Sequence, residues 1–105
     1  MKYAAAVSLL LSFSAFSASY SEISFVSGLT VGGGYVRVKL ENMKEAEGCK
    51  ISKFYYLQPS SNQEIFSSLL AMKAAKQKVS FQLSGCQNDM PVITHMYMCD
   101  TDFCN

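Results

Sequence analysis

The sequence predicts a mainly β domain that contains one helix, an α+β arrangement. Five segments rich in β-branched and aromatic residues are separated by glycine, proline or polar residues, which is typical of strands. One further segment repeats its apolar residues with the 3.6-residue period of an amphipathic helix. Because this segment follows the third strand segment, the predicted order is strand-strand-strand-helix-strand-strand.

The N-terminal residues 1–19 have the pattern of a secretory signal peptide. A positive start at Lys2 precedes an apolar run over residues 4–16, and small residues follow at positions suited to cleavage after Ser17 or Ser19. An uncleaved membrane anchor is the alternative, but the run is shorter than the roughly 20 residues that span a bilayer. We therefore expect a secreted protein, periplasmic in transit, with residues 20–105 as its single domain.

The composition of the expected mature domain limits its partners. Nine basic residues less Lys2 leave eight, which balance the eight acidic residues. A neutral chain without a basic patch argues against nucleic acid as a partner. An apolar core in a chain of this size stabilises the fold only marginally. Four cysteines in an exported chain therefore predict two disulfides.

The first two predicted strands form a hairpin around three consecutive glycines. Residues 22–31 have strand composition, with a bulge expected at Ser27 and Gly28. Glycines 32–34 accept positive φ and suit the connection, whereas a phosphate-binding loop would also need a Lys-Ser/Thr pair and a following helix. Residues 35–40 alternate, which directs three side chains to the core: Val36, Val38 and Leu40.

The third strand is predicted over residues 49–57, after a polar loop at 41–48. Its alternation changes phase between Ile51 and Phe54, which predicts a second bulge. Solvation is expected to keep three carboxylates of the loop ordinary: Glu41, Glu45 and Glu47.

The helix is predicted to begin near Asn62, because Ser61 and Glu64 have the spacing of a capping box. Its buried face is expected to carry Ile65, Phe66, Leu69, Leu70 and Met72. Small residues occupy the opposite face, where charged ones are usual. These residues suit the close approach of a second helix, or alanine is present simply as the best helix former. The face includes Ser67, Ala71 and Ala74.

Two strands follow the helix. Residues 78–83 form the first, residues 84–90 turn the chain, and residues 91–99 form the last strand. Local connections throughout predict antiparallel pairing of the five strands. The strand after the helix directs three side chains inward: Val79, Phe81 and Leu83.

The cysteines divide most simply into a local pair, Cys99–Cys104, and a long-range pair, Cys49–Cys86. A metal site at the local pair, with its two intervening aspartates, is the alternative. It lacks the CxxC spacing of a zinc knuckle, so no metal is expected.

Catalysis has little support in the sequence. The single histidine, His95, lies within a predicted strand, and no serine or cysteine has an activating base in a recognisable pattern. A binding protein without a cofactor is therefore expected rather than an enzyme. A small secreted hydrolase, the third hypothesis, would need a pocket around His95.

The predicted order of elements is that of a five-stranded antiparallel barrel of the OB-fold type. The run IFSSLLAMKAAKQKVSF at 65–81, followed by PVITHMYMC and the loop that Cys99 and Cys104 enclose, resembles the pentameric B subunits of bacterial A-B toxins. The closest likeness is to the pertussis-type and subtilase-type branches. It covers the second half of the chain well and the first half thinly.

This resemblance implies a ring of five barrels, homomeric or heteromeric, whose helices line a central pore. The pore face would carry Ser67, Ala71 and Ala74. The resemblance also implies glycan binding, with Ser27 in the context Phe-Val-Ser-Gly-Leu as the residue that bonds a sialic acid. A serine at a bulge leaves room for a ligand carboxylate, although the bend alone also accounts for it. Gln82 stands where sialic-acid-binding members have a tyrosine, and Tyr35 completes the predicted glycan-binding set.

The function expected from these observations is a secreted glycan-binding B subunit of a multimeric A-B toxin. It would bind host-cell glycans or glycoproteins and deliver a separate catalytic A subunit. The alternative is a free-standing secreted or periplasmic module of the same fold that binds or inhibits a protein partner.

Overall fold

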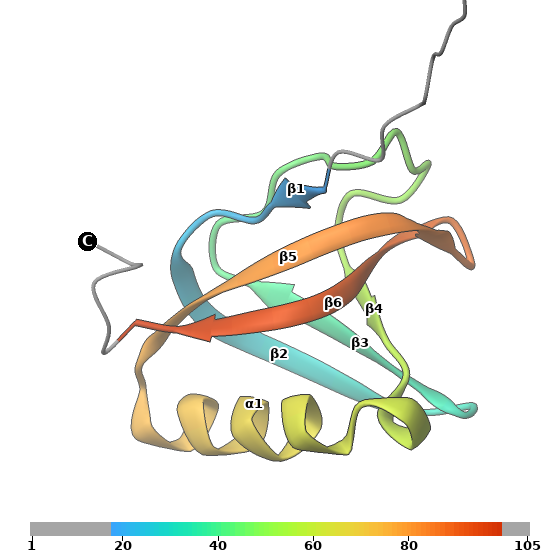
Figure 1. Ribbon diagram of the computed structural model, residues 1–105. Helices are drawn as coiled ribbons and strands as arrows, with labels where there is room; N and C mark the ends of the chain where they lie inside the picture. Colours follow the sequence, from blue (N-terminus) through green and yellow to red (C-terminus); the bar gives the residue numbers. More distant parts are fainter. Residues whose placement is uncertain (1–17, 100–105) are drawn as a thin grey trace, which may run out of the picture.

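The computed structural model describes residues 18–99 (Figure 1). The predicted leader therefore lies outside the described residues up to position 17, and its last residue, Ser19, lies in the first strand. The predicted Cys99–Cys104 bond also lies outside them, because Cys104 belongs to segment 100–105.

The described chain is mainly β with one α-helix, as predicted. A single 3₁₀ turn precedes the helix. The elements in order are β1 (Ser19–Tyr20), β2 (Ser24–Gly32), β3 (Tyr35–Leu40), β4 (Tyr55–Leu57), the 3₁₀ turn (Pro59–Ser61), α1 (Gln63–Ala75), β5 (Lys78–Gln87) and β6 (Met90–Met98).

Five of the six strands pair in a closed cycle, in the order β2, β3, β4, β6, β5 and back to β2. The short β1 pairs with β5 beyond the end of β2. The prediction of five antiparallel strands is wrong in two respects. β1 is a sixth strand, and β4 pairs with β6 in parallel, where Tyr56 lies opposite Val92. The connection from β4 to β6 contains α1 and β5, so it is a crossover and not the local turn that antiparallel pairing requires.

The β2–β3 hairpin is confirmed in detail. Its turn contains Gly33 and Gly34 at φ values of 70° and 86°, which a residue with a Cβ rarely adopts. The register shifts between Val26 and Gly28, so the predicted bulge is present at Ser27. The alternation of β3 is also confirmed, because all three predicted core residues are fully buried: Val36, Val38 and Leu40.

The third strand is shorter than predicted, because residues 49–54 do not pair with a strand. Segment 49–54 instead crosses the end of the β5–β6 hairpin, where the backbone N–H of Ile51 donates to the carbonyl of Asp89 at 2.8 Å. The hairpin turn itself, Asn88–Asp89, has φ values of 52° and 66°, as a tight two-residue turn requires. The prediction of a second bulge is therefore wrong, because residues 51–54 precede β4 and the change of phase marks the point where strand pairing begins.

The helix begins where predicted but not by the predicted cap. Asn62 precedes α1 without a side-chain cap, and the hydroxyl of Ser61 donates to the carbonyl of Gln58 at 3.4 Å, so the capping box is absent. Prediction of the buried face is correct for Ile65, Leu69 and Met72. It is wrong for Leu70, which is 45% exposed and points away from the sheet.

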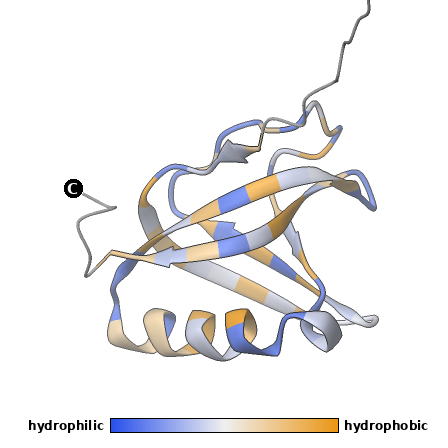
Figure 2. Cartoon of the chain, viewed as in Figure 1, coloured by the Kyte–Doolittle hydropathy of each residue, from blue (hydrophilic) through white to orange (hydrophobic). Residues whose placement is uncertain are grey.

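The core lies inside the strand cycle, with α1 across one end of it (Figures 1 and 2). Tyr55 and Phe81 are both fully buried and meet edge to face with ring centroids 5.9 Å apart. Leu69, also fully buried, joins the helix to the same cluster. The inward residues predicted for the strand after the helix are confirmed: Val79, Phe81 and Leu83.

Candidate functional site

A groove lies between β2 and the last turn of α1, and we call it the helix-end groove. Its volume is about 500 Å³. Strand β2 supplies one wall and the end of α1 supplies the other. Glu41, which directly follows β3, is the single acidic residue of the lining. The lining residues are Phe25, Val26, Ser27, Glu41, Met72, Lys73, Lys76 and Gln77.

Ser27 reaches this groove because of the bulge. The extra residue interrupts the ladder with β3, and the hydroxyl of Ser27 donates to the carbonyl of Lys39 at 3.2 Å. The side chain is exposed. Its oxygen can therefore still accept a hydrogen bond from a bound molecule.

Lys76 lines the same groove as Ser27 and has an unusual backbone conformation. It ends α1 with φ 56° and ψ 48°, in the left-handed region where glycine is the usual residue. Its backbone N–H and that of Gln77 satisfy the last carbonyls of the helix, at Lys73 and Met72. A side chain in this conformation costs roughly 1 kcal/mol relative to a right-handed one. Lysine thus occupies a position where glycine would be the more stable choice.

The groove combines charges with an apolar floor. Lys73 and Lys76 outnumber the single carboxylate, Glu41, and Gln77 adds an amide. Phe25, Val26 and Met72 are the apolar members, and the ammonium of Lys78 lies 5.6 Å from the ring of Phe25. Such a site can bind a small polar molecule that has one negative group, several hydroxyls and an apolar part.

A second groove, here the loop groove, has a volume of about 450 Å³. It lies between β3, segment 50–54 and the β5–β6 turn. Its lining residues are Tyr35, Arg37, Lys50, Ile51, Ser52, Lys53, Phe54, Asn88 and Met90.

The structure does not bring the three predicted glycan-binding residues together. Ser27 lines the helix-end groove and Tyr35 lines the loop groove. Gln82 lines neither. It pairs with His95 across β5 and β6, and its side-chain oxygen accepts a hydrogen bond from the hydroxyl of Tyr97 at 3.1 Å.

Sequence reasoning missed the partners of Ser27 in its groove. A signal for two of them existed, because Lys73 and Lys76 fall on the apolar arc of the helix, where charged residues mark the edge of a buried contact. Nothing local connects them to Ser27, which lies more than forty residues earlier in the chain.

His95 is exposed, and its Nδ1 lies 3.1 Å from the hydroxyl of its neighbour Thr94. Neither groove includes it. Within residues 18–99, no three side chains of His, Cys, Asp or Glu lie close enough together to hold a metal ion.

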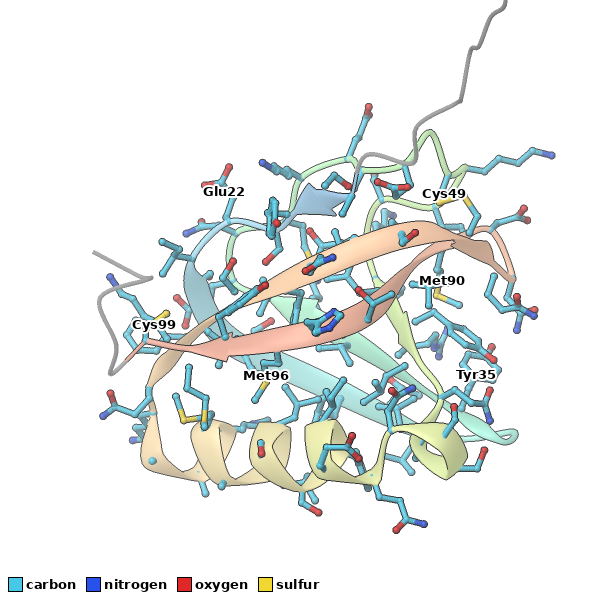
Figure 3. All side chains as sticks on the ribbon, viewed as in Figure 1. Glu22, Tyr35, Cys49, Met90, Met96 and Cys99 are labelled. Carbon is cyan, nitrogen blue, oxygen red and sulfur yellow. A yellow bond between two sulfur atoms is a disulfide. The ribbon has the colours of Figure 1, made fainter. Side chains whose placement is uncertain are left out.

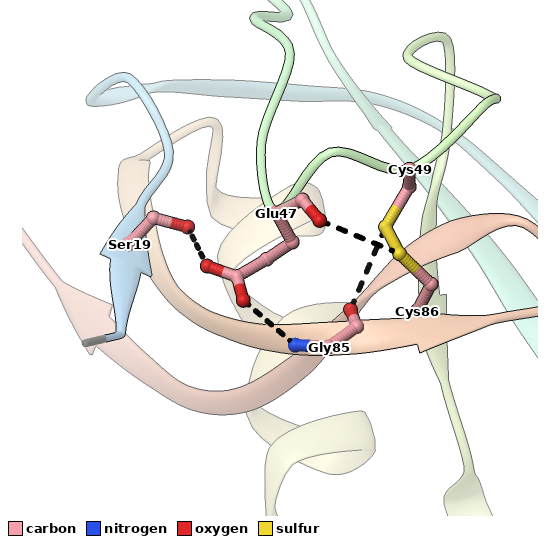
Figure 4. The surroundings of a disulfide bond; sticks show 5 residues. All are labelled: Ser19, Glu47, Cys49, Gly85 and Cys86. Atoms are coloured by element: carbon pink, nitrogen blue, oxygen red, sulfur yellow. Dashed lines mark hydrogen bonds between the residues drawn. A yellow bond between two sulfur atoms is a disulfide. The ribbon is translucent and has the colours of Figure 1, made fainter. Parts of the chain in front are cut away.

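The predicted Cys49–Cys86 disulfide is present, and Glu47 lies beside it (Figure 4). One oxygen of the Glu47 carboxylate accepts from the hydroxyl of Ser19, and the other accepts from the backbone N–H of Gly85 at 2.9 Å. The hydrogen bond from Ser19, then that from Gly85, lowers the pKa of Glu47 below its usual value. The prediction of an ordinary carboxylate is therefore wrong for Glu47, which joins β1 to β5.

We predict that Glu47→Gln lowers the free energy of unfolding at neutral pH but not at acidic pH, where the Glu47 carboxyl is itself protonated. A carboxyl whose pKa is lowered by folding contributes stability above its unfolded pKa, and this contribution disappears as the pH falls through the folded pKa. Because Glu47 is only half-buried, the expected loss at pH 7 is below about 1 kcal/mol. Urea unfolding of both proteins at pH 7, 5 and 3 measures it, with residues 18–105 as the chain so that Ser19 is retained. Glu45→Gln, in the same loop, is the control, and an equal loss at every pH would contradict the prediction.

The predicted pore residues lie on the face of α1 that points away from the sheet. Ser67, Ala71 and Ala74 are all exposed in the single chain, and Leu70 lies among them. Charged residues of the helix flank this face and do not interrupt it.

Known proteins give no identification by similarity. No family model, no curated protein and no solved structure matches the chain. Among residues 18–99, none of the helical segments has the length and apolar character of a membrane span.

Proposed function

We propose that this protein is a secreted glycan-binding B subunit of an A-B toxin, built on an OB-fold-like barrel. The support for the barrel is the closed strand cycle, whose five strands have the helix between the third and the fourth in chain order, β4 and β5. The single observation that carries the binding function is the helix-end groove, whose lining combines Ser27 with two lysines.

The ligand class that this groove suits is a sialic acid at the end of a glycan. The carboxylate of the sugar would pair with Lys73 or Lys76, and its hydroxyls would bond Ser27, Gln77 and Glu41. Its N-acetyl methyl group would contact the apolar floor. A sialic acid has a group for each of these three kinds of contact, and the groove supplies them within about 500 Å³.

The conformation of Lys76 supports the same proposal. Residues held in sparsely populated conformations are found preferentially at functional sites, where the local cost is tolerated. Replacement of Lys76 by glycine would relieve this cost and remove the cation. Selection for stability alone would favour glycine, so the ammonium group is the feature that a binding role explains.

The proposed assembly is an oligomer, with a pentamer as the state that the toxin likeness implies. Its contact would be the outward face of α1, since small uncharged side chains let two helices approach closely. A separate catalytic chain would then bind the assembled ring.

We predict that Lys76→Gly weakens sialoside binding at least tenfold and that Ser27→Ala weakens it about fivefold. A hydrogen bond to a charged group contributes about 1.5–3 kcal/mol and one between neutral groups about 0.5–1.5 kcal/mol, and 1.4 kcal/mol corresponds to a factor of ten. The variants are Ser27→Ala and Lys76→Gly, and NMR titration with sialyllactose measures the dissociation constants from the amide signals of residues 25–27, 72–73 and 76–77, which line this groove and not the loop groove. Lys76→Gly should unfold at equal or higher urea concentration than the wild type, so its loss of binding cannot come from misfolding.

Lactose and the Lys44→Gln variant are the controls. Lysine 44 is an exposed cation that lines neither groove. Equal affinity for lactose and sialyllactose, or unchanged affinity in both groove variants, would contradict the proposal. A monomer without sialoside affinity would favour the free-standing module that binds a protein.

A further inference from the structure

The loop groove contains three cations and no carboxylate. Arg37 comes from β3, whereas Lys50 and Lys53 come from segment 50–54. These three are among the eight basic side chains of residues 20–105. The aromatic rings of Tyr35 and Phe54 also line the groove. Cations and aromatic rings around one hollow favour an anionic ligand with a flat or ring-shaped body.

Arg37 is positioned by packing rather than by an ion pair. Its guanidinium carbon lies 4.9 Å from the centre of the Phe54 ring, a cation–π arrangement, and the side chain is half-buried. No carboxylate among residues 18–99 forms an ion pair with it. A guanidinium fixed on a ring presents its N–H donors in one plane, which matches the two oxygens of a carboxylate or sulfate.

Tyr35 lies on the same face of β3 as Arg37 and is also held in place. The ring of Tyr35 stacks on that of Tyr56, with centroids 4.9 Å apart and planes inclined by 19°. The hydroxyl of Tyr56 donates to the side-chain oxygen of Gln58, and the amide of Gln58 donates to the carbonyl of Gly34 at 2.9 Å. The hairpin turn therefore holds Tyr35 in place before a ligand arrives, which lowers the entropic cost of binding.

Segment 50–54 is anchored next to this wall. The disulfide at Cys49 ties its start to β5, and Ile51 bonds the β5–β6 turn. Figure 3 shows Cys49, Met90 and Tyr35 at the same end of the molecule, far from Glu22 and Cys99. The two lysines thus extend from a backbone whose position is set by covalent and hydrogen bonds.

We propose that the loop groove is a second saccharide site, which binds an acidic sugar unit through its carboxylate or sulfate. The anion would pair with Arg37 and the two lysines, and the sugar ring would lie against Tyr35. This inference rests on the proposed glycan-binding function but not on the helix-end groove.

A saccharide fits the loop groove better than nucleic acid does. Single-stranded nucleic acid needs a basic track along which several bases stack in succession. The whole chain has a formal net charge of +1, and the groove holds about 450 Å³. This volume suits one or two sugar rings and not a chain of nucleotides.

The test is an NMR titration of the oxidised protein with four probes. These are a sulfated uronate disaccharide, its unsulfated counterpart, lactose, and a ten-residue oligothymidine. Both acidic disaccharides should shift the amide signals of residues 35–37 and 50–54. Both disaccharides contain a carboxylate, so tighter binding of the sulfated one identifies sulfate as the recognised group, whereas equal affinity identifies the carboxylate. Arg37→Gln and Lys53→Gln should each weaken their binding about tenfold, while Lys44→Gln and Ser27→Ala should leave it unchanged.

Three outcomes would overturn the inference. Lactose could bind as tightly as the acidic disaccharides, Arg37→Gln and Lys53→Gln could both retain wild-type affinity, or oligothymidine could bind more tightly than every sugar. Loss of sialyllactose binding in Ser27→Ala with retained binding here would leave the proposed function and this site both intact. If the loop groove binds acidic disaccharides but the protein has no affinity for sialosides, only the proposed sialoside site in the helix-end groove is refuted.

Discussion

Removal of the Cys49–Cys86 disulfide should lower the free energy of unfolding by about 4 kcal/mol. The bond joins residues separated by 37 positions, so it restricts a large part of the unfolded chain. In the chain-entropy description, a loop of this length gives a stabilisation of about 4 kcal/mol at 25 °C. Domains of this size are stable by only about 5–10 kcal/mol. The loss should therefore bring the protein close to unfolding at 37 °C.

The Cys49→Ala/Cys86→Ala double variant tests this expectation by urea unfolding at 25 °C. Replacement of both cysteines avoids a free thiol that could form new disulfides. A loss below about 1 kcal/mol would contradict this account, because it would show that the unfolded chain keeps the two segments close together without the bond.

The same double variant should affect the two grooves unequally. The disulfide lies at the start of the segment that carries Lys50 and Lys53, so binding of acidic disaccharides at the loop groove should weaken. The helix-end groove lies between β2 and the end of α1, and neither element contains a cysteine of this bond. Sialoside binding by the folded fraction should therefore be unchanged.

The sequence predicts those parts of the fold that nearby residues determine. The glycines of the β2–β3 turn need positive φ, and the alternation of β3 can bury only one of its faces. The parallel pairing of β4 with β6 is different, because it brings together Tyr56 and Val92 across a helix and a strand. No local pattern contains this information.

The candidate site shows the same division. The bulge at Ser27 is a local feature and could be predicted, but Lys76 reaches the groove through the packing of α1 on β2. Glu47 looked like one more loop carboxylate, and only the approach of Ser19 and Gly85 gives it hydrogen bonds. Tertiary contacts therefore decide which polar residues share a site.

Leu69 and Leu70 should respond in opposite ways to truncation. Leu69 is fully buried between α1 and the strands, so Leu69→Ala removes core contacts and leaves a cavity. The expected loss is about 3 kcal/mol, the usual range for a buried leucine being 2–5 kcal/mol. Leu70 is 45% exposed, and Leu70→Ala should change the stability of the single chain by less than about 0.5 kcal/mol. Urea unfolding at low protein concentration compares the two variants.

The Leu70 variant also tests the proposed assembly, because this side chain is 45% exposed in the single chain. If the outward face of α1 joins copies of the chain, Leu70→Ala should raise the concentration at which the oligomer dissociates. Ala71→Glu, which introduces a charge between the helices, should prevent assembly entirely. Sedimentation velocity over a range of concentrations measures both effects, with the exposed Ser60→Glu as the control. A wild-type protein that remains monomeric throughout would show that the small residues of this face serve helix formation alone.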